Sequence, residues 1–71
     1  MGAFDSMSGV VVSFDDHGGY GTVQSPDGTT WTFHCTAIAD QSRSIDRGAE
    51  VAFEVVPGRG GRWEATNLRP T

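Results

Sequence analysis

The sequence predicts an all-β domain in which five short strands form a closed or nearly closed antiparallel barrel. Ten of its 71 residues are glycine, about twice the usual share, which favours a fold with many tight turns. Turn-forming residues recur about every ten residues between β-rich runs, and no stretch offers a convincing amphipathic helix of about ten residues. A flat sheet of five strands would expose one face and both edges, so closure into a barrel is favoured.

The predicted strands are short runs rich in β-branched and aromatic residues, bounded by Gly, Pro and Asp. They span residues 10–14, 20–24, 29–35, 49–56 and 62–68. The strongest turn signal is Ser25-Pro26-Asp27-Gly28, which supplies a fixed φ, an Asx turn and a positive-φ position in succession. Residues 36–48 are polar and less regular, and residues 37–43 could hold at most a short 3₁₀ turn.

Length and composition indicate a single small domain. We expect residues 1–7 to be a flexible N-terminal extension and residues 8–69 to form the barrel. Cys35 is the sole cysteine, so no internal disulfide can form, which suits a reducing, cytoplasmic location. The longest aliphatic run, residues 10–12, is far shorter than the roughly 20 apolar residues of a membrane helix. We therefore expect a cytoplasmic monomer with no membrane contact.

Side-chain alternation sorts the strand residues into an inner and an outer set, because residues two apart on a strand share a face. The inner set, predicted to be largely buried, is Val11, Val23, Trp31, Phe33, Val51, Phe53 and Val55. The set predicted to lie outside the first three strands is Val10, Val12, Tyr20, Thr22, Thr32 and His34.

Several short motifs occur along the chain in a characteristic order and spacing. They are Gly-Val-Val-Val-Ser-Phe at residues 9–14, Gly-Tyr-Gly-Thr-Val at 19–23, Thr-Phe-His-Cys at 32–35, Val-Ala-Phe-Glu-Val at 51–55 and Ala-Thr-Asn-Leu at 65–68. In these motifs the chain resembles the bacterial cold-shock domain family across residues 9–68. The resemblance implies a five-stranded OB-type barrel that binds single-stranded DNA and RNA, with no catalysis and no cofactor.

The departures from the family's motifs fall at its binding positions. The family's surface tryptophan is Ser13 here, and the second aromatic of its first nucleic-acid motif is Thr22. The phenylalanines that flank its second motif are Thr32 and Cys35. Stacking of a base on an aromatic ring contributes about 1–3 kcal/mol, so the loss of several rings predicts a weakened binder.

The charge distribution also opposes phosphate binding. The net charge is −4, and all five basic residues are arginines. Residues 1–42 contain no base, and the acids there are Asp5, Asp15, Asp16, Asp27 and Asp40. The predicted binding strands would therefore present negative surroundings to a nucleic-acid backbone.

The residues predicted to bind nucleic acid are Phe14, Tyr20, His34, Arg59, Arg62 and Trp63. Tyr20 and His34 are either stacking groups or a cross-strand pair that covers the sheet. Phe14 is expected to be half-buried at its strand end. Trp63 has no counterpart recognised in the family, and it either replaces the lost tryptophan or closes the barrel end.

The sequence argues against three other kinds of site: a zinc site, a nucleophile–base pair and a phosphate loop. His34 and Cys35 are adjacent on a predicted strand, so their side chains should point to opposite faces and not share a zinc ion with His17. No nucleophile–base pair is suggested, and the glycine-rich run at residues 18–21 does not precede a helix as a phosphate loop would. The sequence thus predicts no enzyme, no metal and no cofactor.

Two functions remain. The first is weak binding of single-stranded RNA or DNA in a chaperone role or in regulation of transcription or translation under stress. The alternative is a protein-interaction module, whose acidic and apolar face contacts a basic protein partner such as part of the transcription machinery.

Overall fold

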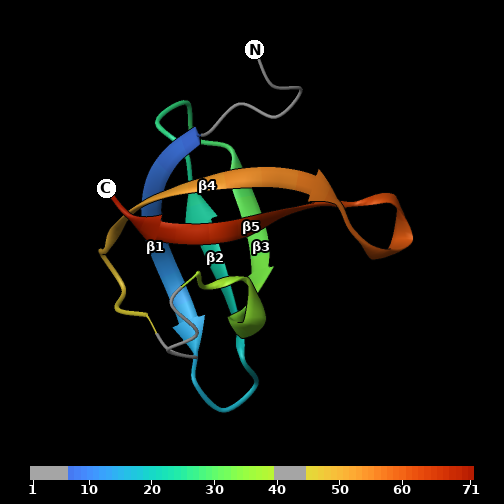
Figure 1. The fold of residues 1–71 in the computed structure, drawn as a ribbon, viewed down its shortest axis with the longest axis horizontal. Coiled ribbons are helices and arrows are strands. Elements are labelled where there is room, and N and C mark those ends of the chain that lie inside the picture. The colour runs from blue at the N-terminus through green and yellow to red at the C-terminus, as the bar shows by residue number, and fades with distance from the viewer. Residues whose placement is uncertain (1–6, 40–44) are drawn as a thin grey trace.

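The computed structural model describes residues 7–39 and 45–71, with Arg59 described by its backbone alone. The strands are β1 (Met7–Asp15), β2 (Tyr20–Gln24), β3 (Thr30–His34), β4 (Glu50–Pro57) and β5 (Trp63–Pro70), with short 3₁₀ turns η1 (Cys35–Ala37) and η2 (Arg59–Gly61). They close into one barrel in the order β1-β2-β3-β5-β4, shown in Figure 1. The predicted all-β, five-stranded barrel is confirmed.

Strand pairing is antiparallel except where the barrel closes. β1 pairs with β2 and β4, β2 with β3, and β4 with β5, all antiparallel. The contact between β3 and β5 is parallel, through Thr32 and Glu64. A closed ring with an odd number of strands cannot alternate throughout, so one neighbouring pair must run parallel.

The predicted boundaries agree with the strands to within a few residues. β1 begins at Met7, which pairs with Phe53 of β4, and residues 1–6 of the predicted extension lie outside the described residues. A 3₁₀ turn is present at Cys35–Ala37, and it overlaps the segment 37–43, which could hold at most such a turn, only at Ala37. Residues 40–43 of that segment lie outside the described part of the chain. Within residues 7–39 and 45–71, no helix has the length and apolarity to cross a membrane.

A β-bulge in β1 changes which residues face outward. Val11 pairs with Val23, but Ser13 pairs with Thr22, so Val12 is the extra residue on β1. Beyond the bulge, simple alternation counted from Val11 no longer holds, because an extra residue reverses the faces of those that follow. Ser13 is consequently exposed and Phe14 half-buried.

The core contains most of the predicted inner set. Val11, Val23, Phe33, Val51 and Phe53 are buried. Trp31 and Val55, predicted to be largely buried, are only partly buried and pack against the edge of this cluster. Ile38, Ala65 and Leu68 complete the core. Ile38 is held there by an isolated parallel bridge to Leu68, a contact between distant segments that alternation within strands does not reveal.

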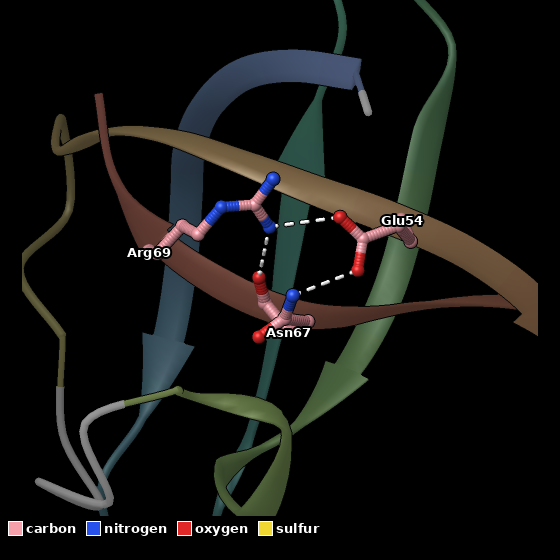
Figure 2. A network of polar contacts seen from close by, with 3 residues as sticks. All are labelled: Glu54, Asn67 and Arg69. Carbon is pink, nitrogen blue, oxygen red and sulfur yellow. Dashed lines mark hydrogen bonds and ion pairs between the residues drawn. The ribbon is translucent and has the colours of Figure 1, made fainter. Parts of the chain in front are cut away.

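A polar network fixes a second irregularity, between β4 and β5 (Figure 2). The side-chain amide of Asn67 donates to Oε1 of Glu54 at 2.8 Å, and the Arg69 guanidinium donates to Oε2 at 2.8 Å. Arg69 also donates to the backbone carbonyl of Asn67 at 2.9 Å. Asn67 has a φ of 56°, so this network holds a side chain in the left-handed region at the bulge.

Candidate nucleic-acid interface

Three rows of cross-strand partners lie on the outer side of β1–β3; one is Val10–Gln24–Thr30, and the other two hold the candidate residues. Of these two, one runs Asp15–Tyr20–His34, and the second runs Ser13–Thr22–Thr32 and continues to Glu64 of β5. Partners directly opposite one another project to the same side of a sheet, so these rows share one surface. We call these residues the outer face: Ser13, Asp15, Tyr20, Thr22, Thr32, His34 and Glu64.

Tyr20 and His34 form the aromatic centre of the outer face. Their ring centroids are 4.8 Å apart and the rings are inclined at 73°, an edge-to-face arrangement. Tyr20 is 57% exposed, which leaves much of its ring free to contact a ligand. The structure thus brings together Tyr20 and His34, for which the sequence left open stacking groups or a cross-strand pair, as cross-strand partners in ring contact.

Hydrogen bonds at the start of η1 set the orientation of the His34 ring. Nδ1 of His34 accepts from the backbone N–H of Thr36 at 3.2 Å and lies 2.9 Å from the Thr36 hydroxyl. A ring nitrogen that accepts a backbone N–H carries no proton, so the neutral imidazole bears its proton on Nε2. The ring of His34 is therefore held in one orientation, and its Nε2–H can donate a hydrogen bond.

Cys35 lies beside His34, contrary to the expectation of opposite faces. Its Sγ is 3.9 Å from Nδ1 of His34. The expectation was wrong because β3 ends at His34 and Cys35 begins η1, where strand alternation no longer applies. Among the described residues, no group of three or more His, Cys, Asp or Glu side chains could hold a metal ion.

Phe14 lies on β1 between the two rows of the outer face, and its side chain packs against the core. It pairs with Gly21, which pairs in turn with Phe33, and the rings of Phe14 and Phe33 stack at 5.9 Å with a 9° interplanar angle. A side chain at position 21 would lie 2.5 Å from Cζ of Phe33, so glycine is required for the rings to meet. Phe14 is half-buried, as expected, and it packs against the core cluster.

The remaining candidates lie on the β4–β5 hairpin, which projects beyond β3 in Figure 1. Trp63 opens β5 opposite Pro57 and is 56% exposed, so its ring is not enclosed by the barrel. Arg62 is exposed beside it, and the side chain of Arg59 is outside the described part of the structure. Since adjacent strand residues point to opposite sides, Glu64 rather than Trp63 continues the outer face.

Glu64 lies on the outer face, a position that was not predicted from the sequence. The parallel contact with Thr32 places it there, and its side chain packs directly over Gly58. Asp15 ends the row of Tyr20 and His34, so each row of the outer face has a carboxylate at one end. No local signal in the sequence indicates this position, because the contact joins strands that are far apart in the chain.

The family of this chain follows from a match to a family model. The model of the 'cold-shock' DNA-binding domain matches residues 7–71. The chain belongs to this family. Cold-shock domains are nucleic-acid-binding and non-enzymatic, so the chain is a cold-shock-like, nucleic-acid-binding protein by membership. The closed barrel and the aromatic pair on its outer face agree with that relationship.

Proposed function

We propose that this cold-shock protein binds single-stranded RNA or DNA weakly, by stacking bases on Tyr20 and His34. The observation that supports this most is the exposed, edge-to-face pair of these two rings at the centre of the outer face. Every base has a π-face, so such a site tolerates many sequences. The binding requires no catalysis and no cofactor.

A second contact is proposed on the projecting hairpin. Trp63 offers an exposed ring for a further base, while Arg62 and Arg59 offer charge for phosphates. Arg69 is less suited to this role, because it is already hydrogen-bonded to Glu54 and to the Asn67 carbonyl. Phe14 contributes from beneath, by supporting the strand end beside Tyr20.

Weak binding follows from the rest of the outer face. Hydroxyl groups occupy the row of Ser13, Thr22 and Thr32, where the family has aromatic rings at the matching positions. Asp15 and Glu64 repel phosphates, and residues 7–39 contain no lysine or arginine. We expect micromolar affinity or weaker at physiological salt. Such binding fits a cytoplasmic monomer that acts as an RNA chaperone or regulates transcription or translation under stress.

Fluorescence anisotropy with a labelled oligo-dT of about ten nucleotides tests the proposal. Tyr20→Ala or His34→Ala should weaken binding about tenfold, which corresponds to the loss of one stacked base. Val12→Ala is the matched control, because Val12 is exposed on β1 but, as the bulge residue, belongs to neither row of the outer face. This variant should change the affinity by less than about twofold. Equal losses in all three variants, or none, would contradict stacking on the Tyr20–His34 pair.

The salt dependence of the same titration tests the phosphate contacts. Each phosphate contact adds about 0.7 to the slope of log affinity against log salt on single strands, so few cations predict a shallow slope. Arg62→Ala should lower the slope by about 0.7 if this side chain holds one phosphate. A steep slope that Arg62→Ala leaves unchanged would show that the contacts lie elsewhere.

A further inference from the structure

The chemistry of the outer face is better matched to a cation than to a phosphate. Each of its two rows has a carboxylate at one end: Asp15 beside Tyr20 in one row and Glu64 beside Thr32 in the other. Between them lie hydroxyl groups and the exposed ring of Tyr20. The described segment 7–39, which forms β1, β2 and β3, holds no lysine or arginine beside these carboxylates.

A guanidinium or ammonium group would find several partners on this surface. Its charge is attracted to the two carboxylates, and the face of a tyrosine ring attracts cations as well. The Ser13, Thr22 and Thr32 hydroxyls can accept or donate hydrogen bonds to the backbone of an extended chain. Val12, which is 37% exposed at the bulge beside this surface, adds apolar contact for the stem of a long basic side chain.

We propose that the outer face binds an arginine- or lysine-rich segment of a partner protein. A basic side chain lies against the ring of Tyr20, and Asp15 and Glu64 pair with cations on either side of it. This goes beyond the proposed nucleic-acid binding, because the same surface takes a ligand of opposite charge. Occupancy by the basic segment then excludes nucleic acid from Tyr20 and His34.

The probe is a fluorescein-labelled peptide of about ten residues that alternates arginine and glycine, with anisotropy as the readout. The test variant is Asp15→Asn with Glu64→Gln, which removes two carboxylates from the outer face and keeps the shape of each side chain. Asn at position 15 can still accept the backbone N–H of His17, as Asp15 does at 3.0 Å. We expect peptide affinity to fall about fivefold, equivalent to two exposed ion pairs.

The matched control is Asp46→Asn with Glu50→Gln, since both residues are exposed and neither belongs to the outer face. It changes the net charge by the same amount, so it should leave peptide affinity within about twofold. Equal weakening by the control would overturn the proposal, because attraction to the overall negative charge would then explain the binding. Loss of binding confined to the test variant and to Tyr20→Ala supports it.

Titration of the same variants with oligo-dT separates this proposal from the proposed function. Removing the two carboxylates should weaken peptide binding and strengthen oligo-dT binding, while Tyr20→Ala weakens both. Tyr20-dependent oligo-dT binding without peptide binding would overturn this proposal alone. Peptide binding that depends on Tyr20, Asp15 and Glu64, without oligo-dT binding, would overturn the proposed function alone. The peptide and oligo-dT should also displace each other, and simultaneous binding would overturn the shared site.

Discussion

At the scale of single residues, Asn67 combines an unusual backbone conformation with a hydrogen bond that holds it. Its φ of 56° lies in the left-handed region, which asparagine tolerates better than most residues with a side chain. The bond from its side-chain amide to Glu54 keeps that carboxylate in reach of Arg69 (Figure 2). Asn67 thus stabilises the irregularity in the pairing of β4 with β5.

Replacement of Asn67 separates these two contributions. Asn67→Ala should lower the free energy of unfolding by about 1–2 kcal/mol, because alanine is strained in the left-handed region and cannot form the hydrogen bond to Glu54. Asn67→Gly loses the bond alone, so its effect should be clearly smaller. Urea unfolding followed by circular dichroism measures both, and equal losses would show that backbone strain at this position is unimportant.

Asp27 in the β2–β3 turn makes stability depend on pH. Its Oδ1 accepts from the Ser25 hydroxyl at 2.7 Å and from the Thr29 N–H at 3.0 Å, and these bonds, led by that from Ser25, lower the pKa of Asp27 below its usual 3.8. A carboxyl whose pKa is lowered in the folded state adds stability above its unfolded pKa. That stability is lost as pH falls through the folded value.

Asp27→Asn should therefore be less stable than the parent chain at about pH 7 and should approach it at about pH 2. Urea midpoints at the two pH values measure this difference. Asp46→Asn, at an exposed position away from the turn, serves as the control. A gap between Asp27→Asn and the parent that stays constant with pH would contradict the role given to this carboxylate.

At the scale of elements, the bulge in β1 decides what the outer face presents. Because Val12 is an extra residue, Ser13 turns outward opposite Thr22, and Phe14 turns toward Phe33. The two positions at which the family has surface aromatics thus lie side by side and exposed or half-buried here. Hydroxyl groups at these positions leave Tyr20 and His34 without flanking rings.

Restoring rings at this pair should strengthen nucleic-acid binding. Ser13→Trp with Thr22→Phe places two aromatics on the outer face in direct register, and each can stack a base for about 1–3 kcal/mol. Affinity for oligo-dT should rise at least about tenfold, measured by anisotropy. Val12→Trp serves as a control for added aromatic surface outside the rows. No gain from the double substitution would favour the protein partner as the ligand of this face.

At the scale of the whole molecule, a small core supports both the barrel and its outer face. Phe33 and Phe53 are the largest fully buried side chains, and they belong to strands on different sides of the barrel. A domain of this size buries a smaller share of its surface than a large one and is marginally stable. Removal of one large core side chain therefore threatens the entire fold.

Phe53→Ala should lower the free energy of unfolding by about 3–5 kcal/mol, since it deletes a fully buried ring and leaves a cavity. The melting temperature by circular dichroism should fall sharply or the transition should vanish. Val55→Ala is the comparison, because the partly buried Val55 should cost much less. An unchanged melting temperature for Phe53→Ala would contradict the core assignment.

The strands, their order along the chain and most of the core were predictable from sequence, because alternation with period two and turn residues are local signals. Tyr20 and His34 were predictable as a pair for the same reason. The tertiary structure alone decided three features of the site: the bulge at Val12, the end of β3 that brings Cys35 beside His34, and Glu64 on the outer face. Each depends on which distant backbone groups pair when the barrel closes, and a rule applied along one strand contains no information on the register of its neighbours.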